Sequence, residues 1–415
     1  MNRYTYRPLA GLILTGVLGI SLSARAGGYQ LHEYSVVSAG RAFGGAGIVG
    51  DDYSSVAFNP AGMTLKESGI QTGAMLMDIH SNLHKGKLYN NGDEVTQGDK
   101  GKLRNPHFIP HFFGQYKLAK DWRLGLGVYV PFGLGTYYNK SWFGKSHSLT
   151  SEIETIDIHP AISWKPLSWL SVGGGFILER MEARLTNALD LAGKKSDMNA
   201  HGWGHGWNAG IMISPNQTTR FGLAYRSPVV QNIKGKHHVQ HPNPMVGVLE
   251  AFSSTKLVDP EHIQLTAYQK MGKFDLSAMA RWTRWSRFNL LAIKTTALNR
   301  YSYVDENWRN TWTVSAGLDY HYCKNLTLRT GLAYDQGAVK NPQHRTARVP
   351  DSNRWIASVG ASYMKGNWQF DVSYFHMFWG KARVNSTATT DPGTVIQGTY
   401  HTQLNSIGLG VQYHF

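Results

Sequence analysis

One stretch decides the fold class of this chain: Ser406-Ile407-Gly408-Leu409-Gly410-Val411-Gln412-Tyr413-His414-Phe415. Apolar residues alternate through it with small or polar ones, and a period of two places the two sets on opposite faces of a β-strand. The last strand of a soluble sandwich is one interpretation, but such a strand leaves an exposed hydrophobic edge. A closed membrane barrel instead needs this strand to pair with its first one. The stretch therefore favours a membrane barrel.

The N-terminus has the pattern of a secretory signal peptide. Arg3 and Arg7 precede an apolar run from Leu9 to Leu22, and Ala24-Arg25-Ala26 then supplies the small residues that a signal peptidase reads. The apolar run is too short for a membrane-spanning helix. We therefore predict that residues 1–26 are a signal peptide, cleaved after Ala26.

The composition agrees with an exported barrel. The single cysteine, Cys323, excludes an internal disulfide framework. The 13 Trp, 21 Tyr and 45 Gly residues suit two interfacial aromatic belts and many tight turns. The mean hydropathy is −0.33, as expected where every second strand residue faces a polar lumen. The formal net charge is +15, or 15 − 3 = +12 after the three arginines of the signal peptide are removed.

Amphipathic segments recur along the chain, with alternately short and long connections between them. We predict about fourteen strands, an even number, as single-chain bacterial barrels have. They lie near 69–80, 106–117, 122–133, 152–165, 168–184, 205–214, 218–228, 257–270, 273–296, 312–322, 326–334, 354–365, 368–374 and 406–415.

The connections separate the two ends of the predicted barrel. Short ones fall near Ala119-Lys120, Lys165-Pro166, Pro215-Asn216, Met271-Gly272, Lys324-Asn325 and Lys365-Gly366. Long ones span roughly 81–105, 138–151, 186–204, 229–256, 297–308, 336–353 and 381–403. Tight turns at one end and long loops at the other are the asymmetry of outer-membrane barrels. The predicted fold class is therefore all-β, a membrane-spanning antiparallel β-barrel.

Lysine and arginine concentrate in the predicted long loops, for example at Lys85, Lys194 and Lys234. Attraction to the anionic phosphates of outer-membrane lipid, lipopolysaccharide included, is one interpretation, and ordinary solvated loop charge is the other. The group His237, His238 and His241 resembles a metal site only weakly. We expect no metal and no cofactor, and nucleic acid is a poor partner for an exported barrel.

Residues 27–68 do not follow the barrel pattern. They are rich in small residues and turns, including Gly40-Arg41-Ala42, Asp51-Asp52 and Asn59-Pro60. A barrel of about fourteen strands has a lumen too wide for side chains alone to fill. We predict that residues 27–68 form a plug, or hatch, inside a barrel of residues 69–415. A periplasmic extension is the alternative.

Short motifs spread over the whole chain match one known family in order and spacing. They are Gly28-Tyr29-Gln30-Leu31-x-Glu33, Gly40-Arg41-Ala42, Asp51-Asp52, Asn59-Pro60-Ala61, Phe132-Gly133-Leu134-x-Thr136, Gly204-x-Gly206-Trp207-Asn208-Ala209-Gly210, Tyr225-Arg226-Ser227, Trp285-Ser286-x-Phe288, Arg329-Thr330-Gly331-Leu332-Ala333-Tyr334-Asp335 and Val349-Pro350-Asp351. With these the chain resembles the FadL family, the outer-membrane transporters of long-chain fatty acids and other hydrophobic compounds. The resemblance implies a fourteen-stranded barrel, a hatch in its lumen and transport rather than enzymatic activity.

The third predicted strand is interrupted. Its alternation ends at Pro131, and Gly133 and Gly135 follow; proline cannot donate to the ladder, and glycines weaken pairing and permit a bend. In the family, an inward kink at this strand opens the barrel wall and lets the apolar ligand leave sideways into the bilayer. The resemblance implies the same here, with Phe132 and Leu134 lining the route. An ordinary strand end at the membrane rim is the alternative.

A fatty acid needs an apolar tunnel with a cation at one end, because a buried carboxylate without a partner is costly. Strand parity predicts that Arg226, Arg281 and Arg309 face the lumen, so these three are the candidate carboxylate partners. The alternative for each is a structural ion pair with a neighbouring Asp or Glu. A neutral ligand such as an aromatic hydrocarbon also stays open.

The family places an aromatic residue in the ligand pocket at the position of Tyr29. The Asn59-Pro60 turn lies near the end of the predicted hatch and is a candidate gating element, or only a turn. Asp51 and Asp52 need partners if they lie in the lumen, and inward-facing Arg329 is a plausible one.

Two rival functions were weighed. A general diffusion porin shares the barrel pattern but needs no segment of forty-odd residues to block it. A hydrolase needs a Ser/His or paired-carboxylate arrangement, and no local motif for one is found, so we expect no enzyme. We expect a monomer in the outer membrane of a Gram-negative bacterium. Its partners would be the hydrophobic ligand, outer-membrane lipid and the outer-membrane barrel assembly machinery.

Overall fold

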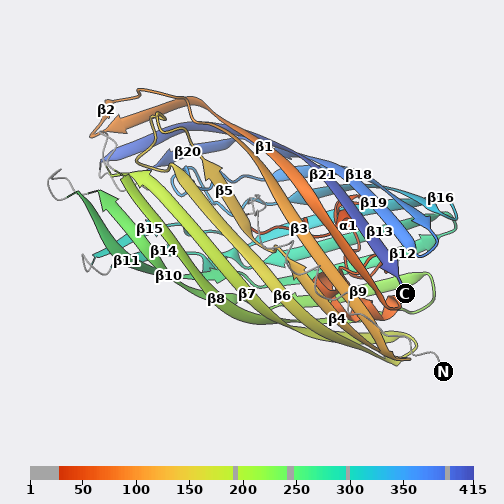
Figure 1. The fold of residues 1–415 in the computed structure, drawn as a ribbon. Coiled ribbons are helices and arrows are strands. Elements are labelled where there is room, and N and C mark those ends of the chain that lie inside the picture. Colours follow the sequence, from red (N-terminus) through yellow and green to blue (C-terminus); the bar gives the residue numbers. More distant parts are fainter. Residues whose placement is uncertain (1–27, 190–194, 241–246, 296–299, 388–392) are drawn as a thin grey trace, which may run out of the picture.

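The fold is an antiparallel β-barrel in which the chain returns to pair with its own first strand (Figure 1). The computed structural model describes residues 28–415 except 190–194, 241–246, 296–299 and 388–392. The predicted signal peptide, residues 1–26, lies outside the described residues. Of the 21 strand segments, six wall strands contribute two each and β2 (Asp93–Glu94) only extends a hairpin, so the wall has 21 − 6 − 1 = 14 strands. The predicted strand number is confirmed.

Eight wall strands are continuous and six are divided. The continuous ones are β1 (Gly69–Asn90), β3 (Lys102–Ala119), β6 (Thr150–Leu167), β7 (Leu170–Ala188), β8 (Lys195–Ile213), β17 (Leu326–Asp335), β18 (Arg354–Lys365) and β21 (Thr394–His414). The divided ones are β4 (Trp122–Tyr129) with β5 (Gly133–Tyr137), β9 (Thr219–Arg226) with β10 (Val229–Gln240), β11 (Val248–Asp259) with β12 (His262–Met271), β13 (Phe274–Thr283) with β14 (Leu290–Thr295), β15 (Arg300–Asp305) with β16 (Thr311–Cys323) and β19 (Trp368–Trp379) with β20 (Ala382–Ser386).

The closing seam explains the alternation at the C-terminus. β21 pairs with β1 from Gly69↔His414 to Asn90↔Thr394, and with β19 on its other side. Its apolar row faces out, with Leu409 65% exposed, whereas Ser406 and Gln412 are each 1% exposed on the inside. The terminal strand has two partners, so it leaves no open edge.

Several predicted long loops are wrong as loops. The intervals 81–105, 186–204, 229–256, 297–308 and 381–403 largely continue the wall strands, whereas 138–149 and 336–353 are irregular as predicted. At this end the outward residues are mostly polar and buried inward ones such as Met198, Ile233 and Leu257 are apolar, so the apolar-outward pattern ends although the ladder pairing continues. The turn predicted at Lys165-Pro166 lies three residues later, at Ser168-Trp169, because β6 extends to Leu167.

Residues 28–68 pack inside the barrel (Figure 1). They contain α1 (Val36–Ala39), α2 (Ser55–Phe58) and the 3-10 helix η1 (Pro60–Leu65). The Ser35 side chain caps α1, and Pro60 is suited to the first position of η1 because it needs no amide donor there. Most of their side chains are buried, so this N-terminal segment supplies the core that a wide lumen otherwise lacks.

The wall approaches the N-terminal segment closely through glycine. A Cβ at Gly331 of β17 would overlap the main chain of Arg41. Gly317 of β16 lies opposite Gly331 in the ladder and also contacts Arg41. Glycine at these two positions therefore lets the backbone of the N-terminal segment lie directly against the sheet. Among the described residues, the helices are all too short or too polar to cross a membrane.

Candidate functional site

An apolar cavity lies between the N-terminal segment and the long-loop end of the barrel. Its volume is about 30 Å³. Side chains from β5, β6, β7, β8, β10, β11 and β14 line it, together with residues 306–308 and the loop 336–353: Tyr29, Leu134, Ser151, Ile153, Ala183, Leu185, Met198, Ile233, Thr255, Leu257, Phe288, Leu291, Glu306, Trp308, Arg348 and Val349. The lining is mostly aliphatic and aromatic, as a hydrophobic ligand requires.

Aromatic rings fill the middle of this region. The Tyr29 ring lies 4.9 Å from Trp285, 5.8 Å from Phe132 and 5.9 Å from Trp308 between ring centroids. Tyr29 is 1% exposed, and its hydroxyl makes no hydrogen bond within the described residues. Tyr29 lines the cavity together with Trp308 and Phe288.

Arg348 is the cation of the cavity. It lies in the irregular loop 336–353 and donates to Ser151 Oγ at 3.1 Å and to Asn187 Oδ1 at 3.4 Å. No described carboxylate lies within ion-pair distance of it. Burial lowers the pKa of Arg348 to about 10, against the opposing effect of Glu306, so the guanidinium is charged at neutral pH. A cation held by neutral partners at an apolar cavity is a ready site for an anionic group.

Glu306 is the second ionisable group at the cavity. It is 2% exposed in the segment between β15 and β16, and its Oε2 accepts from Trp308 Nε1 at 3.0 Å. Burial raises the pKa of Glu306 to about 7, more than Arg348 lowers it. Near neutral pH this carboxyl is therefore close to half protonated.

The N-terminal segment is joined to the interruption in the third wall strand. Gln30 forms an antiparallel bridge with Phe132. Leu31 N donates to Pro131 O at 2.8 Å, and Gly133 N donates to Tyr29 O at 2.8 Å. The kink thus exchanges wall pairing for pairing with residues 29–31. Phe132 and Leu134 are buried in the same apolar cluster as Tyr29.

The ladder is interrupted at this kink. β4 pairs with β3 only up to Phe112↔Val128, and β5 pairs with β6 from Gly133↔Glu154 onward. Residues 102–111 of β3 pair with β1 on one side, but have no ladder pairing with β5 on the other. In hydrocarbon, backbone that leaves a ladder must be satisfied by protein or line a cavity. The main chain of residues 29–31 supplies part of that compensation.

Arg226 faces the lumen as predicted and lies in an ion-pair cluster. Its guanidinium contacts Asp157 at 2.6 Å and Glu179 at 2.9 Å, and donates to Tyr129 OH at 3.1 Å. The structural alternative considered for this arginine therefore matches its surroundings. With two carboxylates already bound, it has little remaining capacity for a third.

Arg281 also faces the lumen and is fully buried on β13. It donates to Gln264 Oε1 and contacts His32 Nδ1 of the N-terminal segment. It does not line the cavity. Strand parity was the wrong guide for Arg309, because residues 306–310 belong to no strand. The Arg309 side chain is half-buried and donates to Gly337 O and Asn353 Oδ1 at 3.0 and 3.1 Å.

A hydrogen-bonded chain connects the N-terminal segment with the residue before the kink. Asn208 Nδ2 donates to Val56 O at 3.0 Å, and Asn208 Oδ1 lies 3.0 Å from His159 Nε2. His159 Nδ1 lies 2.9 Å from Tyr129 OH, and Tyr129 ends β4. A neutral His159 with its proton on Nε2 satisfies all three contacts. The main chain and these side chains thus couple the same two elements.

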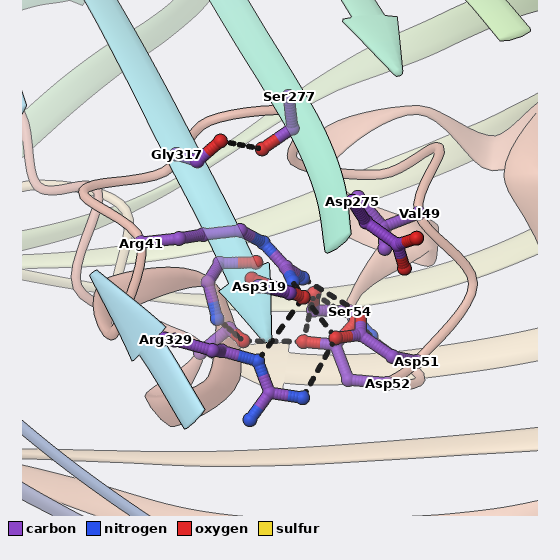
Figure 2. A network of polar contacts seen from close by, with 12 residues as sticks. Arg41, Val49, Asp51, Asp52, Ser54, Asp275, Ser277, Gly317, Asp319 and Arg329 are labelled. Carbon is purple, nitrogen blue, oxygen red and sulfur yellow. Dashed lines mark hydrogen bonds and ion pairs between the residues drawn. The ribbon is translucent and has the colours of Figure 1, made fainter. Parts of the chain in front are cut away.

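Two arginines and two aspartates hold the N-terminal segment to the wall (Figure 2). Asp51 contacts Arg41 at 2.7 Å and Arg329 of β17 at 3.0 Å. Asp319 of β16 contacts Arg41 at 2.5 Å and Arg329 at 3.4 Å. The predicted partnership of Asp51 with Arg329 is confirmed. Asp52 instead accepts from Ser35 and Ser54 within the segment.

The remaining predicted elements have structural contacts. Asn59 accepts from Ala61 N at 3.1 Å at the start of η1, and its amide donates to Ile211 O of β8 at 3.2 Å. His237 Nε2 lies 2.8 Å from Ser196 Oγ and its Nδ1 lies 2.9 Å from Ser253 Oγ, whereas His241 lies outside the described residues. In the described part of the chain, no three His, Cys, Asp or Glu side chains are grouped to hold a metal ion.

A lumen-filled antiparallel barrel with an apolar outer surface defines the class of outer-membrane β-barrels. The family model described as outer membrane protein transport protein (OMPP1/FadL/TodX) matches residues 17–415. The chain therefore belongs to this family of non-enzymatic transporters of hydrophobic compounds in the Gram-negative outer membrane.

Individual relatives agree with this family assignment. The chain is 27% identical to a 47 kDa outer membrane protein of Pasteurella multocida, over 97% of this chain and 98% of that protein. It is 26% identical to the long-chain fatty acid transport protein of Escherichia coli K12, over 86% and 89% of the two chains. Two solved structures share the fold. A Pseudomonas aeruginosa FadL homologue has a TM-score of 0.87 at 23% identity over 94% and 100% of the chains. The Ralstonia pickettii toluene transporter TbuX has a TM-score of 0.68 at 16% identity over 93% and 99%.

The sequence did not single out Arg348, Glu306 or Trp308. Arg348 immediately precedes the motif Val349-Pro350-Asp351, which was the one available signal. Strand parity draws attention to arginines on strands, and Arg348 lies in an irregular loop that reaches the cavity.

Proposed function

We propose that this protein takes up long-chain fatty acids, with the carboxylate bound at Arg348 and the acyl chain in the apolar cavity. The observation that carries the proposal is a charged guanidinium with no described carboxylate partner among aliphatic and aromatic side chains. Relatives named long-chain fatty acid transport protein support it.

A monoaromatic hydrocarbon is the alternative ligand, because toluene transporters share this fold. A neutral ring would fill the space beside Tyr29 and Trp308 but leave Arg348 without an anion. Burying a cation without a counter-charge costs free energy, whereas a carboxylate here gains a charge-assisted contact. The site therefore favours an amphiphile with an anionic head.

Ligand entry moves Tyr29. A cavity of about 30 Å³ is far below the several hundred Å³ of typical ligand pockets. Displacing the Tyr29 side chain opens the space between Trp285, Trp308 and Phe132 without a change in the wall. The ligand then replaces the ring contacts that Tyr29 gives up.

Exit is lateral, between β3 and β5. The ladder interruption at Pro131, Gly133 and Gly135 lies beside the cavity, and Leu134 lines both. An apolar ligand that passes there reaches lipid without crossing water. Pro131, Gly133 and Gly135 are the gating residues of this route.

The binding test compares palmitate with toluene on the detergent-solubilised protein by calorimetric titration. Arg348→Met should weaken palmitate binding by about 10- to 100-fold, from the loss of charged hydrogen bonds, and leave toluene unchanged. Arg383→Met, an exposed arginine at the same end, is the matched control and should bind palmitate normally. Palmitate binding that survives Arg348→Met, or toluene binding tighter than palmitate, would favour the hydrocarbon alternative.

The exit test replaces Pro131, Gly133 and Gly135 together with β-branched residues. The change should favour regular wall pairing and leave palmitate binding from outside intact, while cellular uptake falls steeply. Uptake equal to wild type would exclude the lateral route.

A further inference from the structure

We infer that the outer wall across β8, β10, β11 and β14 carries a binding site for the phosphorylated headgroup of lipopolysaccharide. The inference concerns the lipid-facing side of the barrel and is independent of the transported ligand. It rests on a cluster of outward lysines whose positions are set by the strand register.

One row of side chains crosses four neighbouring strands at a single level. His201 of β8 lies opposite Lys234 of β10, Lys234 opposite Ser254 of β11, and Ser254 opposite Lys294 of β14. Lys256 lies two residues from Ser254 on β11 and opposite Asn232. Diagonal neighbours of this kind are about 7–8 Å apart, so Lys234 and Lys256 can reach one phosphate group together.

These side chains point away from the lumen. The inward neighbours of Lys234 and Lys256 are buried, with Ile233 at 0% and Leu257 at 2% exposure, and both lysines are exposed. Thr295 and Leu291 are buried on β14, which places Lys294 on the outer face. The row therefore faces the surrounding membrane.

The row lies at headgroup height. Val230 and Val258 are opposite each other and face outward, and the next outward pair along the same strands is Asn232 with Lys256. Lys234 and Ser254 follow one step further. Two residues along a strand span about 6.8 Å, less when the strand is tilted. The polar layer beside the hydrocarbon core is roughly 5–8 Å thick, so Lys256 lies within it and Lys234 lies at its outer side, where both long side chains can reach lipid phosphates.

Two lysines of this surface, Lys234 and Lys256, have no carboxylate partner among the described residues. Other outward lysines at this end do: Lys87 contacts Glu94 at 2.7 Å, Lys195 contacts Asp197 at 3.1 Å and Lys236 contacts Glu250 at 2.8 Å. An unpaired group of lysines at headgroup height is complementary to phosphate.

Trp203 completes the surface below the row. It is 53% exposed on β8, two residues below His201, and Arg180 of β7 lies over its ring at 5.6 Å. An indole at the boundary between hydrocarbon and headgroup suits an acyl chain next to its sugar and phosphates. Lipopolysaccharide offers both, so we assign it as the occupant in preference to a phospholipid.

The test measures lipid A binding to delipidated protein in detergent by native mass spectrometry. The probes are bisphosphorylated lipid A, monophosphoryl lipid A and phosphatidylglycerol. Two lysines at roughly fivefold each predict that Lys234→Gln with Lys256→Gln weakens bisphosphorylated lipid A by about 30-fold. The matched control, Lys87→Gln with Lys195→Gln, removes two lysines that already have carboxylate partners and should change binding less than twofold.

Wild-type protein should prefer bisphosphorylated over monophosphoryl lipid A, and either over phosphatidylglycerol. Heat-modifiable mobility confirms that each variant is a folded barrel before it is titrated. Equal lipid A affinity in the wild type and the Lys234/Lys256 variant would overturn the assignment. Phosphatidylglycerol binding as tight as lipid A would overturn the choice of lipopolysaccharide.

Discussion

Asp51 should keep the N-terminal segment docked in the barrel, and Asp51→Asn should release it part of the time. The substitution keeps the size of the side chain but leaves Arg41 and Arg329 to share one carboxylate, Asp319. Breaking a buried ion pair costs about 3–5 kcal/mol. The Asp51 side chain is 24% exposed, so water offsets part of that loss, and we expect about 2 kcal/mol.

A loss of about 2 kcal/mol raises the population of the released state roughly 30-fold. Single channels in planar bilayers measure this population directly, because a barrel whose N-terminal segment has left the lumen conducts ions. We expect brief openings of Asp51→Asn to occupy about 30 times more of the recording than those of the wild type. Asp197→Asn is the matched control, since Asp197 also contacts two basic side chains, Arg184 and Lys195 at 3.1 Å each, and both belong to the wall strands β7 and β8.

A double-mutant cycle tests the reasoning further. Arg329→Gln alone should also raise the open fraction, and adding it to Asp51→Asn should have less than the summed effect, because the two residues share one interaction. Strict additivity, or an open fraction of Asp51→Asn equal to that of Asp197→Asn, would refute the proposed role of Asp51.

The ion pairs of Asp51 with Arg41 and Arg329 also predict a pH dependence. Burial raises the pKa of Asp51, but Arg41 and Arg329 outweigh it and hold the pKa below the ordinary value near 4. A carboxylate with a depressed pKa contributes stability above its unfolded pKa and loses it as pH falls through the folded one. The open fraction of the wild type should therefore be flat from about pH 8 to about pH 4 and rise only in stronger acid.

Three further outcomes are expected. Deleting residues 27–68 should leave a barrel that inserts but conducts ions freely, and near-zero conductance in planar bilayers would contradict the plug assignment. Removing Tyr413 and Phe415 should impair insertion, because Tyr413 packs on Trp368 at 4.7 Å and Phe415 N closes onto Ser68 O at 3.0 Å; a normal yield of heat-modifiable barrel would count against it. Palmitate affinity should rise from about pH 8 to about pH 6, because the raised pKa of Glu306, about 7, means that its negative charge beside Arg348 disappears in that interval; Glu306→Gln should flatten the profile.

The fold was predictable because apolar and polar residues alternate along a barrel strand wherever the strand faces lipid on one side and the lumen on the other. β16 and β18 alternate strictly, and their bounds lie close to the predicted ones, whereas β21 begins twelve residues before the predicted strand. β10 and β11 were predicted as loop, because beyond the apolar band their outward residues are Asn232, Lys234 and Lys256 rather than aliphatic. Hydrogen bonds continue there without a hydropathy signal. Strand pairing depends on the ladder, whereas sequence alternation reports only the contrast between lumen and lipid.

The site was predictable only in part, for a related reason. The alternation along a strand identifies which residues face the lumen, and it correctly predicted that Arg226 and Arg281 face inward. In a lumen filled by an N-terminal segment, however, an arginine can also form structural contacts. Arg226 meets Asp157 and Glu179, and Arg281 meets His32. A ligand cation must instead lack an ion-pair contact with a protein carboxylate. That property depends on which side chains converge in space, and Arg348 has it because its loop folds over an apolar region.

The contacts of residues 29–31 join ligand binding and lateral exit in one element. The Tyr29 side chain lines the cavity, while its carbonyl accepts from Gly133 N and the next residue but one donates to Pro131 O. A ligand that displaces the Tyr29 ring therefore strains the same short stretch of main chain that holds the kink. If the stretch shifts, Gly133 at the start of β5 loses its hydrogen bond to Tyr29 O, and the kink loosens beside the occupied cavity. Under the proposed mechanism, occupancy of the site and opening of the lateral exit are then two consequences of one movement.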